Sequence, residues 1–490
     1  MRSVGTLATG ALFASAAQAQ VVQWDIAKRH TLPKFTKRQD GTFTEVITNE
    51  KLRGGYFASC QVGTPGQNLT LQLDTGSSDI WVPSSTASVC ETSSQNNGCT
   101  FGSFDETASN TFTVVGEGEF SISYVDGSHS TGDYVADTFE IGGATLDNLT
   151  MGLGLSTDIP YGLVGVGYAL NEAIISETHS ASSAYDNLPV LMQKQGLIAT
   201  NAYSLWLNDL DASTGSILFG GIDTEKYQGD LTRINIYKDS QTGAFSSFIV
   251  ALTSLQASSS SGADELSSSQ FPVPVVLDSG TTFSYLPTDL AEQVWNEVGA
   301  GYNSQVGVAL LPCEMENSAG HFSFGFGGSG GPVINITMDE LVLPLTDGEP
   351  VQFQSGPYSG QDACQFGIQN FSSPPYLLGD TFLRSAYVVY DLVNNEIGLA
   401  PTDFNSTTSN VVAFASEGAQ IPSASAAPNQ AEVTQTGTLS TPTYGASGGF
   451  QNDKASAASL LPPAFDWSRI AVMGASMALV MVGSGFFLLF

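Results

Sequence analysis

The chain has 490 residues with 15 Lys and Arg against 47 Asp and Glu, which gives a formal net charge of −32 at pH 7. Such a surface repels nucleic acids and anionic lipids, so a nucleic-acid-binding protein is excluded and a protein that works in an acidic medium or on cationic ligands is favoured. The length allows about three average domains, or two large ones with appended segments.

The first 38 residues are typical of two processing segments. Residues 1–19 combine an N-terminal base, an apolar stretch and Ala17-Gln18-Ala19, which predicts a signal peptide cleaved before Gln20. Residues 20–38 end in the dibasic pair Lys37-Arg38 and predict a propeptide that is removed after Arg38. Its bases would pair with the acidic body of the protein until cleavage. A buried N-terminal helix and a basic surface arm are the respective alternatives.

An aspartate at the end of an apolar run occurs twice. Residues 71–81 read LQLDTGSSDIW, and residues 275–287 read VVLDSGTTFSYLP. A single Asp-Gly stretch of this kind is usually a turn. Each half of the chain also has a later apolar-apolar-Gly step, at Gly162-Leu163-Val164-Gly165 and at residues 376–379. This internal duplication predicts two similar β lobes, over residues 39–226 and 227–402, each of which contributes one aspartate to a shared centre.

The segments between these motifs indicate an all-β fold. Short runs such as GEFSISYV and GSILFGG alternate with Gly, Asp, Asn and Ser, and the clearest helical segment is TDLAEQVWNEV after Pro287. Within FSISYVDGSHSTGD, residues 120–133, the pair Asp126-Gly127 predicts a β-hairpin.

Cysteines and sequons agree with a secreted protein. Of the five cysteines, Cys90 with Cys99 would close a polar loop, and Cys313 with Cys364 would connect two distant parts of the later half. Cys60 lies in the apolar YFASCQV, where a buried free thiol is favoured over an intermolecular bridge. N-glycosylation is predicted at five sequons, whose acceptors are Asn68, Asn148, Asn335, Asn370 and Asn405.

The C-terminal part of the chain differs in composition from the rest. Residues 403–456 are rich in Ser, Thr, Ala, Pro and Gly, which predicts a disordered stalk. Residues 470–490 are an apolar run with no basic residue after it, so a GPI-attachment signal over residues 457–490 is favoured over a transmembrane helix. Ser456 is the predicted attachment residue, with Asn452 and Ser447 as alternatives. We expect the secretory pathway to deliver the chain to the outer face of the plasma membrane or to the cell wall.

The sequence resembles the pepsin-like aspartic proteases over nearly all of residues 45–402. YFASCQVGTPGQ is similar to the first substrate-side strand and turn of the family, the two Asp motifs are similar to its catalytic loops, and residues 122–132 are similar to its flap. The signal peptide, dibasic site, Ser/Thr-rich segment and C-terminal anchor are most similar to the fungal GPI-anchored yapsin-type group. The resemblance implies a bilobal all-β fold with the active site in the cleft between the lobes.

The resemblance also implies a role for each residue of the two motifs. Asp74 and Asp278 would divide general base and general acid work on a water, with no covalent intermediate, metal or cofactor. Two carboxylates in contact cannot both ionise cheaply, so the pair would keep one proton at acidic pH. Support for the pair is expected from six neighbours: Thr75, Gly76, Ser77, Ser279, Gly280 and Thr281. The hydroxyl residues among them would otherwise be plain loop caps.

Flap residues are expected to bind the substrate. Tyr124 matches the flap tyrosine of the family, and Gly127 and Ser128 follow it in the turn. Asp126 lies where several fungal members place an acid that accepts Lys or Arg at the residue before the cut; otherwise it is a simple turn aspartate. Trp81 is expected to support the flap from below. We expect a monomer that acts on peptides or proteins.

Two glycine-rich patterns and the remaining acids carry no predicted function. Gly325–Gly330 matches a dinucleotide-binding pattern but lacks the following helix, and Gly445–Gly449 matches a hydrolase elbow but lies in the predicted stalk. Asp380 and Asp391 lack the hydroxyl-Gly-hydroxyl sequel and are predicted to be structural. The main alternative to an endopeptidase is a non-catalytic peptide-binding or wall protein on the same fold.

Overall fold

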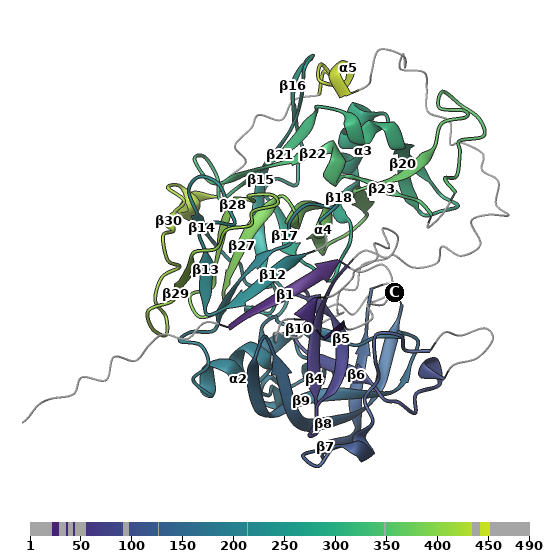
Figure 1. Ribbon diagram of the computed structural model, residues 1–490. Coiled ribbons are helices and arrows are strands. Elements are labelled where there is room, and N and C mark those ends of the chain that lie inside the picture. Colours follow the sequence, from purple (N-terminus) through teal and green to yellow (C-terminus); the bar gives the residue numbers. More distant parts are fainter. Residues whose placement is uncertain are drawn as a thin grey trace, which may run out of the picture.

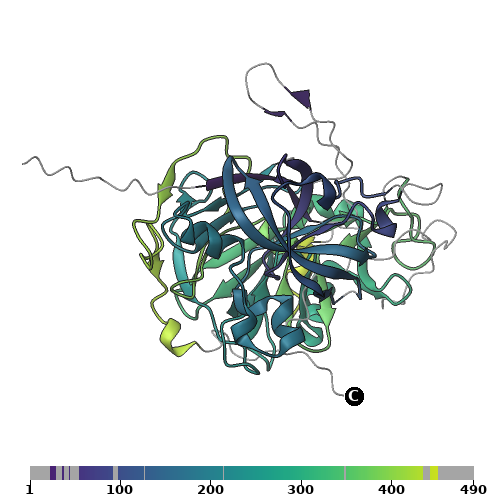
Figure 2. The ribbon, with the colours of Figure 1, turned by 90° about the horizontal axis from the view of Figure 1, so that it is seen from below.

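The computed structural model describes residues 55–91, 98–125, 127–212, 214–346, 349–433 and 442–450, together with three short strands nearer the N-terminus. Two β-rich lobes lie one above the other in Figure 1, and Figure 2 views the molecule from the side of the N-terminal lobe. The described residues are mostly strands with few helices, as predicted.

One sheet of 14 strands runs from the N-terminal lobe into the C-terminal lobe. The N-terminal lobe contributes seven strands: β4 (Tyr56–Val62), β5 (Gln67–Asp74), β6 (Ile80–Pro83), β7 (Thr113–Ser123), β8 (His129–Ile141), β9 (Ala144–Thr157) and β10 (Leu163–Gly165). Six more continue the sheet: β11 (Ala202–Trp206), β12 (Gly215–Phe219), β14 (Thr232–Asn235), β27 (Ala386–Asp391), β28 (Glu396–Pro401) and β30 (Ser425–Ala426). The predicted lobe division at residues 226 and 227 falls just before β14, inside this shared sheet.

The predicted propeptide supplies the fourteenth strand, β1 (Val22–Lys28). This strand pairs antiparallel with β12 on one side and with β4 on the other. The two further short strands near the N-terminus, β2 (Thr36–Lys37) and β3 (Phe43–Thr44), pair with each other.

The rest of the C-terminal lobe consists of two further sheets. The larger contains β15 (Ile249–Ser259), β16 (Gly262–Leu266), β17 (Val273–Leu277), β18 (Ser284–Pro287), β21 (His321–Phe326), β22 (Val333–Thr337), β25 (Ile368–Phe371) and β26 (Tyr376–Leu378). The smaller contains β19 (Gly301–Asn303), β20 (Val308–Pro312), β23 (Val342–Pro344) and β24 (Ala363–Phe366).

Helices are short and lie between the strands. The α-helices are α1 (Ala173–Thr178), α2 (Leu188–Lys194), α3 (Thr288–Val298), α4 (Asp380–Leu383) and α5 (Ser447–Phe450). The 3-10 helices are η1 (Ser88–Cys90), η2 (Glu106–Ala108), η3 (Ala169–Asn171), η4 (Ala181–Ser183), η5 (Cys313–Asn317), η6 (Met338–Glu340) and η7 (Gln430–Glu432). The helix predicted after Pro287 is α3. None of the helices in the described ranges has the length and apolarity needed to cross a membrane, and the apolar run of residues 470–490 lies outside those ranges.

The internal duplication is visible in the strand pairing around each aspartate motif. In the N-terminal lobe, β10 pairs parallel with β5 and antiparallel with β6. In the C-terminal lobe, β26 pairs parallel with β17 and antiparallel with β18. The strand before each Asp and the strand after it are therefore held apart by the later apolar-apolar-Gly segment of the same lobe, as the repeated motifs indicate.

The prediction of a disordered stalk that begins at residue 403 is wrong for the described part of that segment. Residues 403–433 follow the surface of the C-terminal lobe, seen as the yellow-green ribbon at its outer edge in Figures 1 and 2. Strand β29 (Val411–Ala413) pairs with β13 (Gly221–Asp223), and Phe414 and Ile421 are buried. Residues 403–433 contain few apolar residues, but Phe414 and Ile421 are enough to pack this segment against the core of the C-terminal lobe.

We therefore expect Phe414→Ala in the full-length chain to lower the free energy of unfolding by about 3–5 kcal/mol, the usual cost of deleting a buried aromatic ring. Phe404→Ala is the matched control, because Phe404 lies in the same segment and is 37% exposed. Urea unfolding measures both variants. Equal stability of the two would contradict the packing described for residues 403–433.

Candidate active site

Asp74 is the last residue of β5 and is fully buried. Its carboxylate accepts two hydrogen bonds from the loop that follows: the Gly76 N–H donates to Oδ1 at 2.7 Å, and the Ser77 hydroxyl donates to Oδ2. A buried carboxylate is costly unless its oxygens have partners. The Thr-Gly-Ser sequel supplies those partners and fixes the orientation of the carboxylate.

Asp278 follows β17 and is held in the same way. The Gly280 N–H donates to its Oδ1 at 2.9 Å, and the Thr281 hydroxyl donates to its Oδ2 at 2.5 Å. Asp278 is also fully buried. The two motifs therefore build equivalent carboxylate environments, one from each lobe.

Reciprocal hydrogen bonds join the two loops. The Thr75 hydroxyl donates to the Leu277 carbonyl at 3.0 Å and accepts from the Ser279 N–H at 2.9 Å. The Ser279 hydroxyl donates to the Leu73 carbonyl at 3.1 Å and accepts from the Thr75 N–H at 3.2 Å. Thr75 and Ser279 thus join the two lobes, and each hydroxyl both donates and accepts.

Glycine is required where the two loops meet. A Cβ on Gly76 would lie 2.5 Å from the Asp278 Oδ1 atom, far inside contact distance, so only glycine allows the second carboxylate to approach. The glycines of the later apolar-apolar-Gly segments also allow close backbone packing. A Cβ on Gly165 would lie 2.7 Å from the Asp79 backbone nitrogen, and a Cβ on Gly379 would lie 2.3 Å from the Thr281 carbonyl oxygen.

Burial and mutual repulsion make the two carboxyls retain a proton. Burial raises the pKa of Asp74, and the charge of Asp278 raises it further against the hydrogen bonds from Ser77 and Gly76. Burial also raises the pKa of Asp278, while the bonds from Thr281 and Gly280 lower it. The titration belongs to the pair. At a pH above the usual pKa of an aspartate, the pair therefore still holds one proton and carries one negative charge.

The predicted flap is a β-hairpin that carries Tyr124, whose phenol is close enough to Asp74 to feel its charge. Strands β7 and β8 pair through Ser123 and His129, and the connecting turn contains Gly127 at φ +86°. Tyr124 is buried, and its hydroxyl accepts a hydrogen bond from Trp81 Nε1 at 2.8 Å. Trp81 thus supports the flap, as predicted. Gly127 is exposed and Ser128 is half-buried at the turn, while Asp126 lies outside the described residues.

A second group of buried acids lies beneath the flap. Asp79 is fully buried and accepts hydrogen bonds from Ala173 N–H at 2.7 Å, from Tyr185 Oη at 2.7 Å and from Tyr134 Oη at 3.3 Å. Burial raises the pKa of Asp79 to about 6. Burial and the neighbouring Asp79 charge raise the pKa of Glu172 to about 10. In the sequence, the only signal for the buried carboxyl of Asp79 is its position inside the DTGSSDIW motif.

Further supporting residues were not predicted because they come from unremarkable loops. Asn171 Nδ2 donates to the Gly76 carbonyl at 3.0 Å, and the Ser78 hydroxyl donates to the Tyr168 carbonyl at 2.7 Å. Of the two acids predicted to be structural, Asp380 begins α4 and Asp391 accepts hydrogen bonds from the Asn394 backbone and side chain. No group of three or more His, Cys, Asp or Glu in the described ranges is arranged to ligate a metal.

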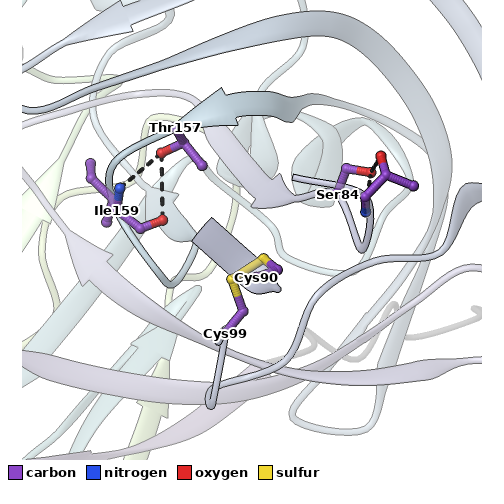
Figure 3. The surroundings of a disulfide bond; sticks show 6 residues. Ser84, Cys90, Cys99, Thr157 and Ile159 are labelled. Atoms are coloured by element: carbon purple, nitrogen blue, oxygen red, sulfur yellow. Dashed lines mark hydrogen bonds between the residues drawn. A yellow bond between two sulfur atoms is a disulfide. The ribbon is translucent and has the colours of Figure 1, made fainter. Parts of the chain in front are cut away.

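The cysteine predictions are confirmed. Cys90 is bonded to Cys99 and Cys313 to Cys364, and Cys60 is a buried free thiol. Figure 3 shows the first disulfide with Ser84 and with Thr157, whose hydroxyl accepts from the Ile159 N–H at 3.0 Å. Of the sequon asparagines, Asn370 is half-buried, and the others are exposed: Asn68, Asn148, Asn335 and Asn405. Their glycosylation stays a prediction.

Comparisons with known proteins agree with this geometry. A family model described as eukaryotic aspartyl protease matches residues 55–402. The probable aspartic-type endopeptidase opsB of Aspergillus oryzae is 41% identical over 416 residues, which cover 84% of this chain and 82% of the relative. An acid protease of Saccharomycopsis fibuligera is 38% identical over 71% of this chain and 81% of its own length. Secreted aspartic protease 8 of Candida albicans is 35% identical over 75% of this chain and 80% of its own length.

We expect Asp79→Asn to remove part of the pH dependence of stability. The pKa of Asp79 is raised from 3.8 to about 6, so its protonation stabilises the folded state below pH 3.8, and this stabilisation is lost as pH rises through 6. A rise of that size corresponds to roughly 3 kcal/mol. The asparagine keeps the shape and does not titrate. The measurement is the free energy of unfolding of both proteins at several pH values across this window, and a difference that does not change with pH would contradict the assignment.

Proposed function

The chain belongs to the eukaryotic aspartyl proteases and is an aspartic endopeptidase; from this premise we propose that Asp74 and Asp278 are its catalytic pair, that it works best at acidic pH and that it is anchored to the cell surface by a GPI lipid. One observation carries the catalytic assignment. The two carboxylates are fully buried, equivalently hydrogen-bonded and joined by the bonds between Thr75 and Ser279. The anchor would place the chain in the fungal yapsin-type group.

The shared proton divides the work between the two carboxyls. The ionised carboxylate accepts a proton from a water as the water attacks the scissile carbonyl carbon. The protonated carboxyl donates a hydrogen bond to the carbonyl oxygen and stabilises the negative charge that develops there. Collapse of the tetrahedral intermediate returns a proton to the leaving amine, so the pair ends the cycle with one proton. The hydrogen bonds from Gly76, Ser77, Gly280 and Thr281 keep both carboxylates oriented throughout.

The flap provides the lid for this reaction. Tyr124 lies on the hairpin, close enough to Asp74 for the charge of that carboxylate to help raise the pKa of the phenol, after the larger effect of burial. A neutral phenol that is hydrogen-bonded to Trp81 closes over the substrate without adding charge. Closing of the hairpin excludes water from the bond being cut. Gly127 and Ser128 at the turn would contact the substrate backbone.

The proposed cellular setting rests on the processing segments predicted at residues 1–38 and 457–490. The signal peptide of residues 1–19 leads into the secretory pathway, and the basic propeptide of residues 20–38 covers the acidic body until it is cut after Arg38. The signal of residues 457–490 is replaced by a GPI lipid at Ser456. The strongly acidic composition suits an acidic exterior, where fewer carboxylates are ionised.

We expect Asp74→Asn and Asp278→Asn each to lower kcat/KM by about 10²–10⁴-fold or more, because each removes one partner of the acid–base pair. Activity of the parent enzyme is expected in acid and is lost as pH rises through the raised pKa of the pair, when the shared proton leaves. The measurement is cleavage of a mixed peptide library from about pH 3 to 7, where such pairs titrate, with and without pepstatin.

Asp230→Asn is the control for this experiment, because Asp230 is exposed and remote from the motifs in sequence. It should cleave as the parent does. Full activity of Asp74→Asn or of Asp278→Asn would contradict the catalytic assignment, as would cleavage that pepstatin does not inhibit. Either result would favour a peptide-binding role for the cleft.

A preference for Lys or Arg before the cut is proposed to come from Asp126. A carboxylate that faces a basic side chain forms a strong charge-assisted hydrogen bond. Asp126→Ala should therefore lower cleavage after Lys and Arg more than cleavage after Leu and Phe, as measured by kcat/KM on paired peptides. An equal loss on both peptides would show that Asp126 serves only the turn.

A further inference from the structure

The last described segment of the chain, residues 442–450, is docked on the C-terminal lobe; we call it the latch. Asp264 of β16 accepts hydrogen bonds from the Thr443 N–H at 3.1 Å, from the Thr443 hydroxyl at 2.5 Å and from the Ala446 N–H at 2.8 Å. At the turn between β15 and β16, the Ser261 hydroxyl donates to the Gly445 carbonyl at 2.7 Å and accepts from the Gly449 N–H at 2.8 Å. The backbone of the latch is thus bound along its length.

Phe450 closes the latch through an apolar contact. Its side chain is 1% exposed and stacks on Phe322 of β21, with ring centroids 5.3 Å apart. A Cβ on Gly320 would lie 2.1 Å from the Phe450 ring, so the slot exists only because residue 320 is glycine. Burial of the Phe450 side chain removes apolar surface from water and so stabilises the docked latch. The space above Gly320 therefore matches the shape of the Phe450 ring. A chance contact would not need such a match.

The glycine-rich pattern of residues 445–449 has its explanation here. A Cβ on Gly449 would lie 2.3 Å from the Ser259 hydroxyl, so a larger residue could not follow the same path. The glycine pattern of residues 325–330 lies against Ala427 and Pro428, which precede the latch in the chain. A Cβ on Gly327 would lie 3.4 Å from Ala427, and a Cβ on Gly330 would lie 3.0 Å from Pro428. Both glycine patterns therefore accommodate the C-terminal segment.

The charge at the latch is compatible with an acidic exterior. Burial would raise the pKa of Asp264, but the hydrogen bonds from Thr443 and Ala446 lower it, so Asp264 is ionised and holds the latch. Burial and the Asp264 charge raise the pKa of Glu297 on α3 to about 8. Glu297 is then protonated in acid and does not repel the Asp264 carboxylate.

We propose that the latch fixes how the anchored enzyme stands on the cell, with the end of the C-terminal lobe formed by β15, β16 and α3 facing the lipid bilayer. This inference rests on the GPI anchoring proposed above. Phe450 is six residues from Ser456, and six extended residues span at most about 20 Å. A free stalk of residues 403–456 would instead reach well beyond 100 Å. The latch therefore keeps the protease against the membrane.

The position of the latch determines which lobe is distal. In Figure 1, α5 and β16 lie at one end of the molecule and β7 and β8 of the N-terminal lobe lie at the other. The flap lobe thus points away from the bilayer. The substrates accessible to such an enzyme are proteins held close to the same membrane surface, rather than proteins deep in a surrounding wall.

The test measures distance from the membrane on intact cells that express the full chain. Fluorophores are attached to Ala263→Cys, exposed on β16, or to Val115→Cys, 58% exposed on β7. Cys60 is buried and is not labelled. Energy transfer to a lipophilic acceptor in the outer leaflet should be greater from position 263 than from position 115. Adding Phe450→Ala should abolish that difference, and adding Phe404→Ala, at an exposed position outside the latch, should leave it unchanged.

The outcomes separate the orientation from the anchoring. Release of the labelled protein by a phosphatidylinositol-specific phospholipase C reports the anchor independently. Equal energy transfer at the two positions in a releasable protein overturns the orientation and leaves the anchor in place. A difference that survives Phe450→Ala shows that the latch is not its cause and overturns the proposal. Protein that the phospholipase does not release overturns the anchor and this inference together.

Discussion

The reciprocal hydrogen bonds between Thr75 and Ser279 are the constraint on which the rest of the structure depends. Each hydroxyl bonds to the backbone of the opposite loop, so neither loop can move without breaking bonds to the other lobe. Gly76 removes the Cβ that would keep the second carboxylate away. Two like charges are thereby held together in a buried site, where the usual response is to retain a proton. The duplicated strands, the shared sheet and the later glycine segments serve to bring these two loops into register.

Buried acids that favour a proton recur outside this centre. Burial is the main cause in Asp79, Glu172 and Glu297, whose pKa values rise to about 6, 10 and 8. A carboxyl with a raised pKa stabilises the folded state when it is protonated and withdraws that stabilisation as pH rises through the raised value. Asp79, Glu172 and Glu297 therefore each contribute stability in acid that is lost as pH rises. This is the same direction as the pH dependence that we propose for the activity of Asp74 and Asp278.

The sequence specifies the centre well because its chemistry needs a fixed local order of residues. Each Asp requires a hydroxyl residue, a glycine and a second hydroxyl residue in succession, so motif and site coincide, and the repetition predicts two lobes. The sequence does not reveal Asp79 as a buried acid, because its hydrogen-bond partners Tyr134, Tyr185 and Ala173 are distant in sequence. Average composition was misleading for residues 403–433, where single residues such as Phe414 fill preformed sites. The slot that holds Phe450 is likewise set by Gly320, which is distant in the sequence.

The central claim is that one proton is shared between Asp74 and Asp278 at acidic pH. Infrared difference spectra of the parent protein minus the double variant Asp74→Asn/Asp278→Asn test it directly, since the other buried acids cancel. At about pH 5, above the ordinary range of an aspartate, the account predicts the bands of one protonated and one ionised carboxyl. Bands from two ionised carboxylates, with no protonated carboxyl, would contradict it.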